Sequence, residues 1–241
     1  MSDLDELLGA LVARGHRGAR LDLEATRAGA RALGSPEERL QVIHVAGTNG
    51  KGSASAMLER IAREAGLRTG LYTSPHLVRF AERIRISGAP IDDEAFASAL
   101  RRVYADASEE LTFFETLTLA AFVAFAEARV ELVVLEVGLG GRLDSTNIVR
   151  APLATAITSI ARGLDGAALE HADRLGSTPE AIAREKAAIA KPGVPMVLGP
   201  LAPGPRLAAI ELALGRGASR VVALAGAEEA LPGGVERALS S

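Results

Sequence analysis

The sequence predicts a three-layer α/β fold built on a parallel sheet, and two observations carry that prediction. Short apolar segments rich in β-branched residues alternate with helical segments along most of the 241 residues. Strands that alternate with helices form parallel sheets with helices packed on both faces. Glycine-rich turns directly follow two of the apolar segments, at residues 47–52 and 138–141. Because ligands of such sheets bind at the carboxyl ends of the strands, we expect function to reside at these turns.

The first half of the chain opens with two helical segments that end at glycines. Prolines at positions 36 and 75 mark turns between later elements. A capping-box pattern, T-x-x-E from Thr112 to Glu115, precedes a long apolar helix. The predicted elements are helices over 3–14 and 21–33, a strand over 39–45, a helix over 54–64, strands over 67–72 and 83–87, and helices over 92–106 and from the capping box to about 128.

The second half continues with strand–helix units. The segment from Glu131 to Val137 is apolar and β-branched, which is typical of a central parallel strand, and it carries one acid near its C-terminal end, Glu136. We expect one domain over 1–225 and a weakly patterned tail or linker over 226–241. The remaining predicted elements are loops over 138–147 and 161–175, strands over 154–160, 195–198 and 220–224, and helices over 178–190 and 206–214.

Composition excludes several classes of protein. The formal net charge is −3, so no broad positive field favours nucleic acid as a partner. Cysteine is absent, which leaves no disulfides and no thiolate chemistry. The N-terminus lacks a signal-peptide pattern, and no apolar run reaches membrane-spanning length. The expectation is a cytoplasmic protein that binds neither nucleic acid nor membrane.

The segment from Val42 to Ser53 reads as a strand, a glycine-rich turn and the start of a helix. Glycines let successive backbone N–H groups point at an anion, and the helix N-terminus adds its positive dipole end, so this arrangement predicts a phosphate cradle. Lys51 would supply a charge, and Ser53 a hydroxyl for a phosphate oxygen or Mg²⁺. The common pattern G-x-x-x-x-G-K-[ST] is not met, since Val45 replaces its first glycine and Gly52 follows the lysine. The alternative is an ordinary turn with a solvated lysine.

Lysine is rare in this chain, which carries most of its positive charge on arginine. The lysines are Lys51, Lys186 and Lys191, so each is a candidate for chemistry that arginine cannot perform. A carboxylate at the position of Glu136 would be costly to bury alone, so it either binds Mg²⁺ or pairs with an arginine. Taken singly, His171 would be a surface or capping histidine, and Lys186 a solvated lysine on a helix.

Five segments together resemble the folylpolyglutamate synthase/dihydrofolate synthase family of the Mur-ligase superfamily. They stand in the order found in that family, and the resemblance runs from about Leu21 to Leu224. It implies a P-loop NTPase-like parallel sheet of the Mur-ligase central-domain type, and the Gly-Lys-Gly-Ser ending of the turn matches this family's own variant. The segments are His44–Ser53, Thr73–Leu77 with Glu82–Ile84, Phe113–Glu115, Glu136–Asn147 and Arg184–Ile189.

The resemblance implies an ATP-dependent amide ligase of folate biosynthesis and one-carbon metabolism. ATP would phosphorylate a carboxylate of dihydropteroate or a folate, and the amino group of L-glutamate would attack the acyl phosphate. By the same resemblance Lys51, Lys186 and His171 are catalytic, and Lys186 matches a lysine that the family carbamoylates. The implied ligands are Gly47, Thr48, Asn49, Gly50, Lys51, Gly52 and Ser53 for ATP; Ser74, Glu136, His171 and carbamoylated Lys186 for Mg²⁺; and Thr112, Phe113, Phe114, Glu115, Arg142, Leu143 and Asp144 for the pterin substrate.

The sequence departs from the family pattern beside the implied metal site. The family's Gly-Leu-Asp-His segment has two possible registers here. We prefer the one that uses His171, after an extra loop at Ala161–Glu170, because it keeps Lys186 at family-like spacing.

The larger departure is length, because family enzymes have a second, C-terminal α/β domain and we expect none here. Three functions stay open. The first is the glutamate ligase, with a C-terminal domain supplied elsewhere if stand-alone activity needs one. The second is a related ligase that adds an amino acid to another carboxylate. The third is a domain that binds nucleotide without turnover.

Overall fold

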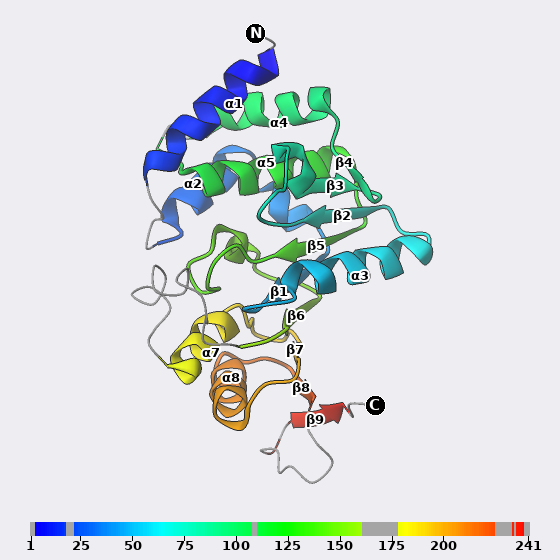
Figure 1. The fold of residues 1–241 in the computed structure, drawn as a ribbon, viewed down its shortest axis with the longest axis vertical. Helices are drawn as coiled ribbons and strands as arrows, with labels where there is room; N and C mark the ends of the chain where they lie inside the picture. Colours follow the sequence, from blue (N-terminus) through cyan, green and yellow to red (C-terminus); the bar gives the residue numbers. More distant parts are fainter. Residues whose placement is uncertain are drawn as a thin grey trace.

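The computed structural model describes residues 3–17, 22–107, 110–160, 178–224, 233 and 235–238. Within these residues the strands form one nine-stranded sheet in the order β4-β3-β2-β5-β1-β6-β7-β8-β9. Figure 1 shows this sheet running through the length of the molecule with helices packed beside it. The strands are β1 (Val42–Ala46), β2 (Thr69–Tyr72), β3 (Ile84–Ile86), β4 (Ala89–Pro90), β5 (Leu132–Glu136), β6 (Ala154–Ile157), β7 (Met196–Leu198), β8 (Val221–Leu224) and β9 (Val235–Ala238).

The sheet is parallel from β2 through to β9, which confirms the predicted fold class. At the other edge, β3 and β4 pair antiparallel, where the sequence analysis expected one short strand over 83–87. The turn between them explains the difference. Ser87 and Gly88 have φ angles of 49° and 85°, and two successive positive φ angles suit the tight turn of a hairpin.

Alternating side chains of the strands divide the interior into two layers of packing. Val133 and Leu135 of β5 join the large core that contains α5, whereas Val134, between them, packs with Leu58 of α3 on the opposite face. The end of the sheet from β6 to β8 packs against α7 and α8. The helices are α1 (Asp3–Ala13), α2 (Glu24–Ala32), α3 (Lys51–Glu64), α4 (Asp93–Asp106), α5 (Phe113–Glu127), α7 (Pro179–Ala187) and α8 (Pro203–Gly215).

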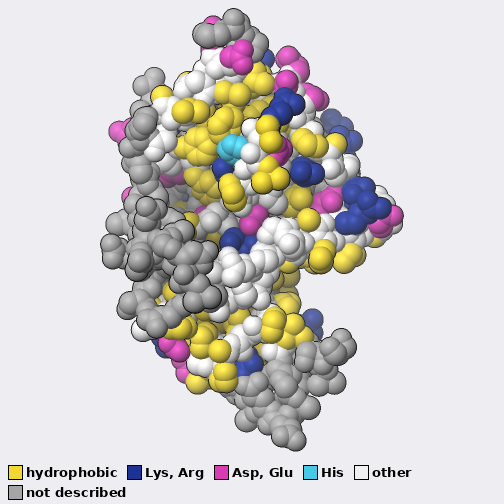
Figure 2. All heavy atoms as spheres, in the orientation of Figure 1, with side chains coloured by type: hydrophobic (Ala, Val, Ile, Leu, Met, Phe, Trp, Pro, Cys, Tyr) yellow, Lys and Arg dark blue, Asp and Glu magenta, His cyan; other side chains and the backbone are white. Residues whose placement is uncertain are grey.

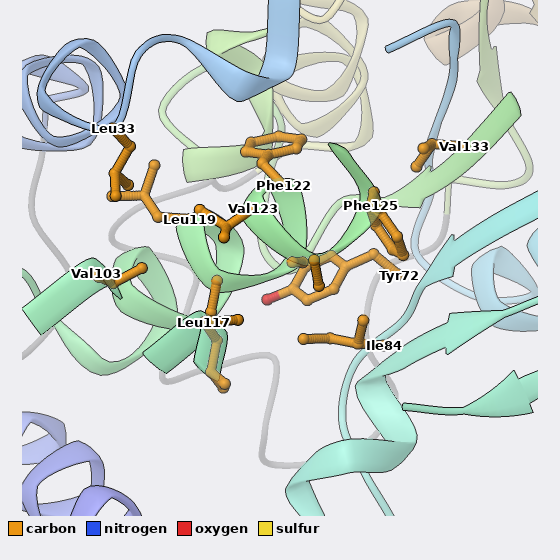
Figure 3. Packing of buried hydrophobic residues seen from close by; sticks show 14 of the residues in the cluster. Leu33, Tyr72, Ile84, Val103, Leu117, Leu119, Phe122, Val123, Phe125 and Val133 are labelled. Carbon is orange, nitrogen blue, oxygen red and sulfur yellow. The ribbon is translucent and has the colours of Figure 1, made fainter. Parts of the chain in front are cut away.

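The large core surrounds α5, whose side chains are buried on nearly all sides. Figure 3 shows Leu117, Phe122 and Phe125 of this helix among side chains from the sheet and from neighbouring helices. Tyr72 and Ile84 are fully buried there as well. Since each fully buried large apolar side chain contributes roughly 1.5–3 kcal/mol, this core anchors the strands that carry the site. Among the helices that the structure describes, none combines the length and apolar character needed to span a bilayer.

Several predicted element boundaries differ from the observed ones by a few residues. Helix α3 begins at Lys51 rather than Ala54, because Gly50 adopts a left-handed conformation as its N-cap and lets the helix start directly after the turn. Helix α7 ends at Ala187 rather than residue 190. The weakly patterned tail contributes β9, which pairs with β8. The predicted loop over 161–175 lies outside the described residues.

Candidate functional site

The turn between β1 and α3, Gly47–Gly50, is called the P-loop here. It lies at the carboxyl end of the central strand, as predicted. Gly47 has a φ of 154° and Gly50 a φ of 79°, conformations that residues with a Cβ rarely adopt. A Cβ on Gly47 would also overlap the hydroxyl oxygen of Thr158, just after β6. Glycine at this position therefore lets the end of β6 close onto the P-loop.

The carbonyl oxygens of the P-loop accept hydrogen bonds from the surrounding protein. Donors reach them from α7, from α3 and from the residues that follow β6. Because these donors hold the oxygens, the negative ends of the peptide dipoles are neutralised before any ligand arrives. The pairs are Gly47 O with Lys186 Nζ (2.8 Å), Thr48 O with Lys51 Nζ (3.2 Å), and Asn49 O with the hydroxyls of Thr158 (2.7 Å) and Ser159 (3.0 Å).

Among the residues that the structure describes, no side chain caps the backbone N–H groups in the first turn of α3. Its N-cap residue is Gly50, which makes no side-chain hydrogen bond to the helix. The first N–H groups of a helix have no partner within it and carry the positive end of its dipole, so they attract anions such as phosphate. Lys51 is the first residue of α3, and Ser53 is exposed one position beyond Gly52. A phosphate cradle requires this local geometry, and phosphate binding by these residues stays a prediction.

Glu136 ends β5, the strand that pairs with β1. Its side chain is 3% exposed, and its Oε2 accepts the backbone N–H of Ser74 at 3.0 Å. Burial raises the pKa of this carboxyl above its usual range, while the Ser74 N–H and the charge of Lys51 act in the opposite direction. A Cβ placed on Gly52 would lie 3.6 Å from Oε2, so the carboxylate faces the first turn of α3.

Lys186 lies on α7 and is only 5% exposed. Its Nζ donates to the Gly47 carbonyl. Burial, followed by repulsion from Lys51, lowers the pKa of Lys186 to about 8. Close packing against the loop after β5 fixes this part of α7, since a Cβ on Gly141 would lie 2.9 Å from the Lys186 carbonyl oxygen. The structure thus makes Lys186 a buried, partly deprotonated amine beside the P-loop.

The residues predicted to bind a metal ion are only partly brought together by what the structure describes. Ser74 and Glu136 are in contact, and Lys186 lies against the P-loop. His171 lies outside the described residues. Within the described part of the chain, no group of three His, Asp or Glu side chains could hold a metal ion. Among the described residues, the oxygen ligands available to an ion here are the Glu136 carboxylate and the Ser74 hydroxyl, to which a modified Lys186, phosphate or water would add.

The residues predicted to bind the pterin substrate fall into two groups. Thr112 and Glu115 form a capping box at the start of α5, and the Asp144 carboxylate accepts the N–H groups of Leu139 and Thr146. These three side chains are at most 6% exposed and have structural partners. The other four keep exposed surface and could touch a ligand. They are Phe113, Phe114, Arg142, whose Nε donates to Glu185 at 2.9 Å, and Leu143.

An aromatic and basic cluster joins the loop after β2 to the start of α5. Arg83 donates through Nε to Nδ1 of His76 at 3.0 Å, and its guanidinium lies 5.5 Å from the centre of the Phe113 ring. The ring of Phe80 lies between, with centroids 4.5 Å from His76 and 5.7 Å from Phe113. Figure 2 shows a histidine on this face within a mostly hydrophobic surface, above a place where acidic and basic side chains meet.

The sequence assigned no role to Thr158 and Ser159, which contact the P-loop. It placed Arg83 in a family segment without indicating that this residue holds His76. A hydroxyl after a strand follows no spacing rule, so no pattern could have found the first two. The neighbouring Glu82 accepts the N–H groups of Leu77, Val78 and Arg79. It thereby shapes the loop that presents Ser74 to Glu136.

The parallel sheet, the P-loop and the buried acid on the adjacent strand define the chain as an α/β domain of the Mur-ligase type. No protein-family model matches the chain. The chain is 48% identical over 158 residues to the dihydrofolate synthase/folylpolyglutamate synthase of Haemophilus influenzae, which covers 66% of this chain and 34% of the relative. The corresponding Escherichia coli protein is 43% identical over 180 residues, covering 74% of this chain and 41% of the relative. The chain belongs to the folylpolyglutamate synthase/dihydrofolate synthase family.

Solved structures of the family extend the match to most of the chain. An FPGS–AMPPCP complex superposes with a TM-score of 0.81 at 34% identity and covers 92% of this chain. Escherichia coli FolC in complex with DHPP and ADP gives a TM-score of 0.79 at 37% identity and covers 90% of this chain. The chain spans 53% and 51% of these two structures, and thus about half of their length.

Proposed function

We propose that the chain is the nucleotide-binding part of an ATP-dependent ligase that adds L-glutamate to a pterin- or folate-linked carboxylate. The observation that carries the proposal is the juxtaposition of three features at one sheet edge. The uncapped start of α3 and Lys51 can hold phosphates, the buried Glu136 faces the same turn, and Lys186 contacts the P-loop. Relatives named for this activity, and solved relatives with AMPPCP or ADP bound, support the assignment.

In this proposal the backbone at the start of α3 and the Lys51 side chain orient the triphosphate of ATP. The N–H groups at the start of α3 stabilise negative charge on the phosphate oxygens, and Lys51 adds a mobile positive charge from the same turn. The acceptor carboxylate attacks the γ-phosphorus and ADP leaves. The acyl phosphate so formed is then attacked by the amino group of glutamate, with release of inorganic phosphate. The contribution of the protein is mainly positioning and electrostatic stabilisation.

The residues at the end of β5 fit a divalent cation. Glu136 is a buried carboxylate whose pKa is raised by burial, and a hard cation such as Mg²⁺ is the partner that would offset that cost. Glu136 would hold the ion together with the Ser74 hydroxyl, and His171 completes the proposed set. When bound, the ion would neutralise charge on the phosphate oxygens.

Lys186 is proposed to act in its carbamoylated form. Its lowered pKa leaves a useful fraction of neutral amine near pH 8, and only the neutral amine attacks carbon dioxide. The ammonium first loses one proton; the neutral amine then forms a nitrogen–carbon bond with carbon dioxide and loses a second proton, which leaves a carbamate anion. That anion would relieve the repulsion with Lys51 and supply an oxygen ligand beside the P-loop.

The acceptor side of the proposed site is the aromatic cluster at the start of α5. Phe113 and Phe114 present partly exposed rings there, and flat heteroaromatic rings stack on such side chains. Solved relatives contain DHPP or folate, which supports dihydropteroate or a folate as the acceptor. Since ATP and L-glutamate are cytoplasmic metabolites, the proposed reaction belongs to the cytoplasm.

The test is ADP release measured with each substrate omitted in turn. The chain is assayed alone and with the C-terminal half of a relative supplied in trans, and Lys51→Met is the control for contaminating ATPase. ADP release that requires both L-glutamate and either dihydropteroate or a folate supports the proposal. Turnover with a different acid, or nucleotide binding without turnover in both formats, overturns the proposed ligase activity.

A further inference from the structure

The two residues that follow β6 direct their hydroxyl groups onto the P-loop. Strand β6 pairs with β1 as far as Ile157 opposite Ala46, and the ladder continues one step, from the Thr158 N–H to the Ala46 carbonyl at 2.9 Å. The Ser159 carbonyl then accepts the N–H of Thr48 at 2.8 Å. The backbone beyond β6 is thereby aligned along the loop.

The hydroxyl groups fix the peptide groups on both sides of Asn49. Ser159 Oγ accepts the Asn49 N–H at 3.0 Å and donates to the Asn49 carbonyl at 3.0 Å. Thr158 Oγ1 lies 2.7 Å from the same carbonyl and 3.3 Å from the Ala46 carbonyl. A hydroxyl has one proton to donate, and the shorter contact identifies Asn49 as its main acceptor.

Two glycines make this approach possible. A Cβ on Gly47 would overlap the Thr158 hydroxyl, and a Cβ on Gly199, after β7, would overlap the Thr158 carbonyl oxygen. Thr158 is therefore held between the P-loop on one side and the end of β7 on the other. Because the Thr158 side chain is already confined, its hydrogen bond to the Asn49 carbonyl costs little further side-chain entropy.

The Asn49 carbonyl needs such a restraint because the next residue is a glycine. Gly50 has a φ of 79°, and glycine accepts either sign of φ with little penalty, so the peptide between Asn49 and Gly50 can rotate readily. Rotation would turn the carbonyl oxygen towards the start of α3 and the N–H away from it. A carbonyl oxygen in that place would repel a bound phosphate.

We propose that Thr158 and Ser159 are positioning residues for nucleotide phosphates: they hold the Asn49 carbonyl away from the start of α3. The inference rests on the proposed nucleotide binding and assigns a role to residues that sequence reasoning missed. Neither side chain needs to touch the nucleotide. Because the two hydroxyl groups act on the orientation of the Asn49 carbonyl, removing them should weaken phosphate binding more than it weakens the fold.

The experiment measures the affinity of the full chain for Mg-ADP with a fluorescent ADP analogue, alongside the thermal midpoint without nucleotide. Thr158→Val removes the hydroxyl and keeps the shape of the side chain. Ser159→Ala removes both hydrogen bonds between the Ser159 hydroxyl and Asn49. We expect each to raise Kd about tenfold. Thr158→Ser keeps the hydroxyl and should restore affinity to within about twofold of wild type.

The matched control is Thr155→Val on the same strand. Thr155 is fully buried and donates to the Pro195 carbonyl at 3.3 Å rather than to the P-loop, so its loss should lower the thermal midpoint and leave Kd unchanged. Wild-type affinity in folded Thr158→Val and Ser159→Ala overturns the positioning role alone. If Thr158→Val does not fold, the Kd of Ser159→Ala for Mg-ADP alone tests the positioning role. Failure of the wild-type chain to bind Mg-ADP overturns the proposed nucleotide binding and this inference with it.

Discussion

Two glycine-rich loops follow neighbouring parallel strands in this molecule, and they use their polar groups in opposite ways. The P-loop, after β1, contains no acidic side chain and leads into a helix whose first N–H groups are uncapped by side chains. The loop over 138–147, after β5, folds around Asp144, which accepts the N–H groups of Leu139 and Thr146. The first loop leads to N–H donors at the start of α3 that a ligand can use, whereas the second directs two of its N–H groups onto its own carboxylate.

A lysine, buried in one case and half-buried in the other, supports each loop in the same manner. Lys186 donates to the Gly47 carbonyl at 2.8 Å, and Lys191 donates to the Asn147 carbonyl at 3.0 Å. Burial lowers the pKa of both lysines to about 8. Because glycine content and lysine support are shared, neither distinguishes a binding loop from a structural one. The distinguishing feature is whether the loop contains its own acceptor.

The largest effect is expected from removing that internal acceptor. Asp144→Ala leaves the Leu139 and Thr146 donors buried without a partner, so the free energy of unfolding should fall by about 3–4 kcal/mol. Asp92→Ala, which removes the exposed N-cap of α4, should cost only about 1 kcal/mol. Urea unfolding measures both variants. Equal losses would show that Asp144 does not organise its loop.

Removing the cation of the P-loop should act on binding instead. Lys51→Met deletes a charge-assisted contact worth roughly 1.5–3 kcal/mol, so the Kd for Mg-ADP should rise ten- to hundredfold. Among the described residues, the half-buried Lys51 donates only to the Thr48 carbonyl in the adjacent turn, so the thermal midpoint should change little. Lys191→Met is the matched control, with unchanged affinity. Unaltered Mg-ADP binding by Lys51→Met would contradict the phosphate role.

The lowered pKa values of Lys186 and Lys191 predict that the stability of the unmodified protein depends on pH. Folding lowers the pKa of each from 10.5 to about 8, so between these pH values the unfolded chain binds more protons than the native one. Stability must therefore rise with pH across this window, by at most about 1.4 kcal/mol per pH unit for each lysine. Lys186→Met and Lys191→Met should each remove about half of that rise, measured by urea unfolding from pH 7 to 10. If the free energy of unfolding of either variant still rises with pH as steeply as that of the wild type, the lysine replaced in that variant is not the source of the rise.

The smallest effects are expected from replacing two glycines, Gly52 in the first turn of α3 and Gly138 in the loop after β5. A Cβ on Gly138 would overlap the ring of Phe114, whereas a Cβ on Gly52 would lie 3.6 Å from the Glu136 carboxylate, an ordinary contact distance. We expect Gly138→Ala to cost about 1–2 kcal/mol through overpacking and Gly52→Ala less than about 0.5 kcal/mol. Thermal unfolding of the two variants distinguishes them. Similar losses would mean that the start of α3 is as closely packed as the other loop.

The sequence was sufficient to predict the parallel sheet, the P-loop and the acid at the end of β5, because each depends on local periodicity or on glycine at a fixed place. It also predicted the capping box of Thr112 and Glu115, which the structure confirms, but it could not predict that Asp144 turns inward. An aspartate that accepts the N–H groups of its own loop and an aspartate that binds a substrate cannot be told apart in a sequence, because both occur in glycine-rich loops after strands. The hydroxyls of Thr158 and Ser159 reach the P-loop only through pairing of β1 with β6, which is a long-range contact that no local pattern records.

The central claim is that the start of α3, and not the loop after β5, receives the nucleotide phosphates. A titration of the ¹⁵N-labelled chain with Mg-ADP, followed by amide chemical shifts, tests it directly. The account predicts large shifts for Gly50, Lys51, Gly52 and Ser53 and small ones over 139–147. Shifts centred on 139–147 with the α3 amides unmoved, or no shifts at millimolar Mg-ADP, would contradict it.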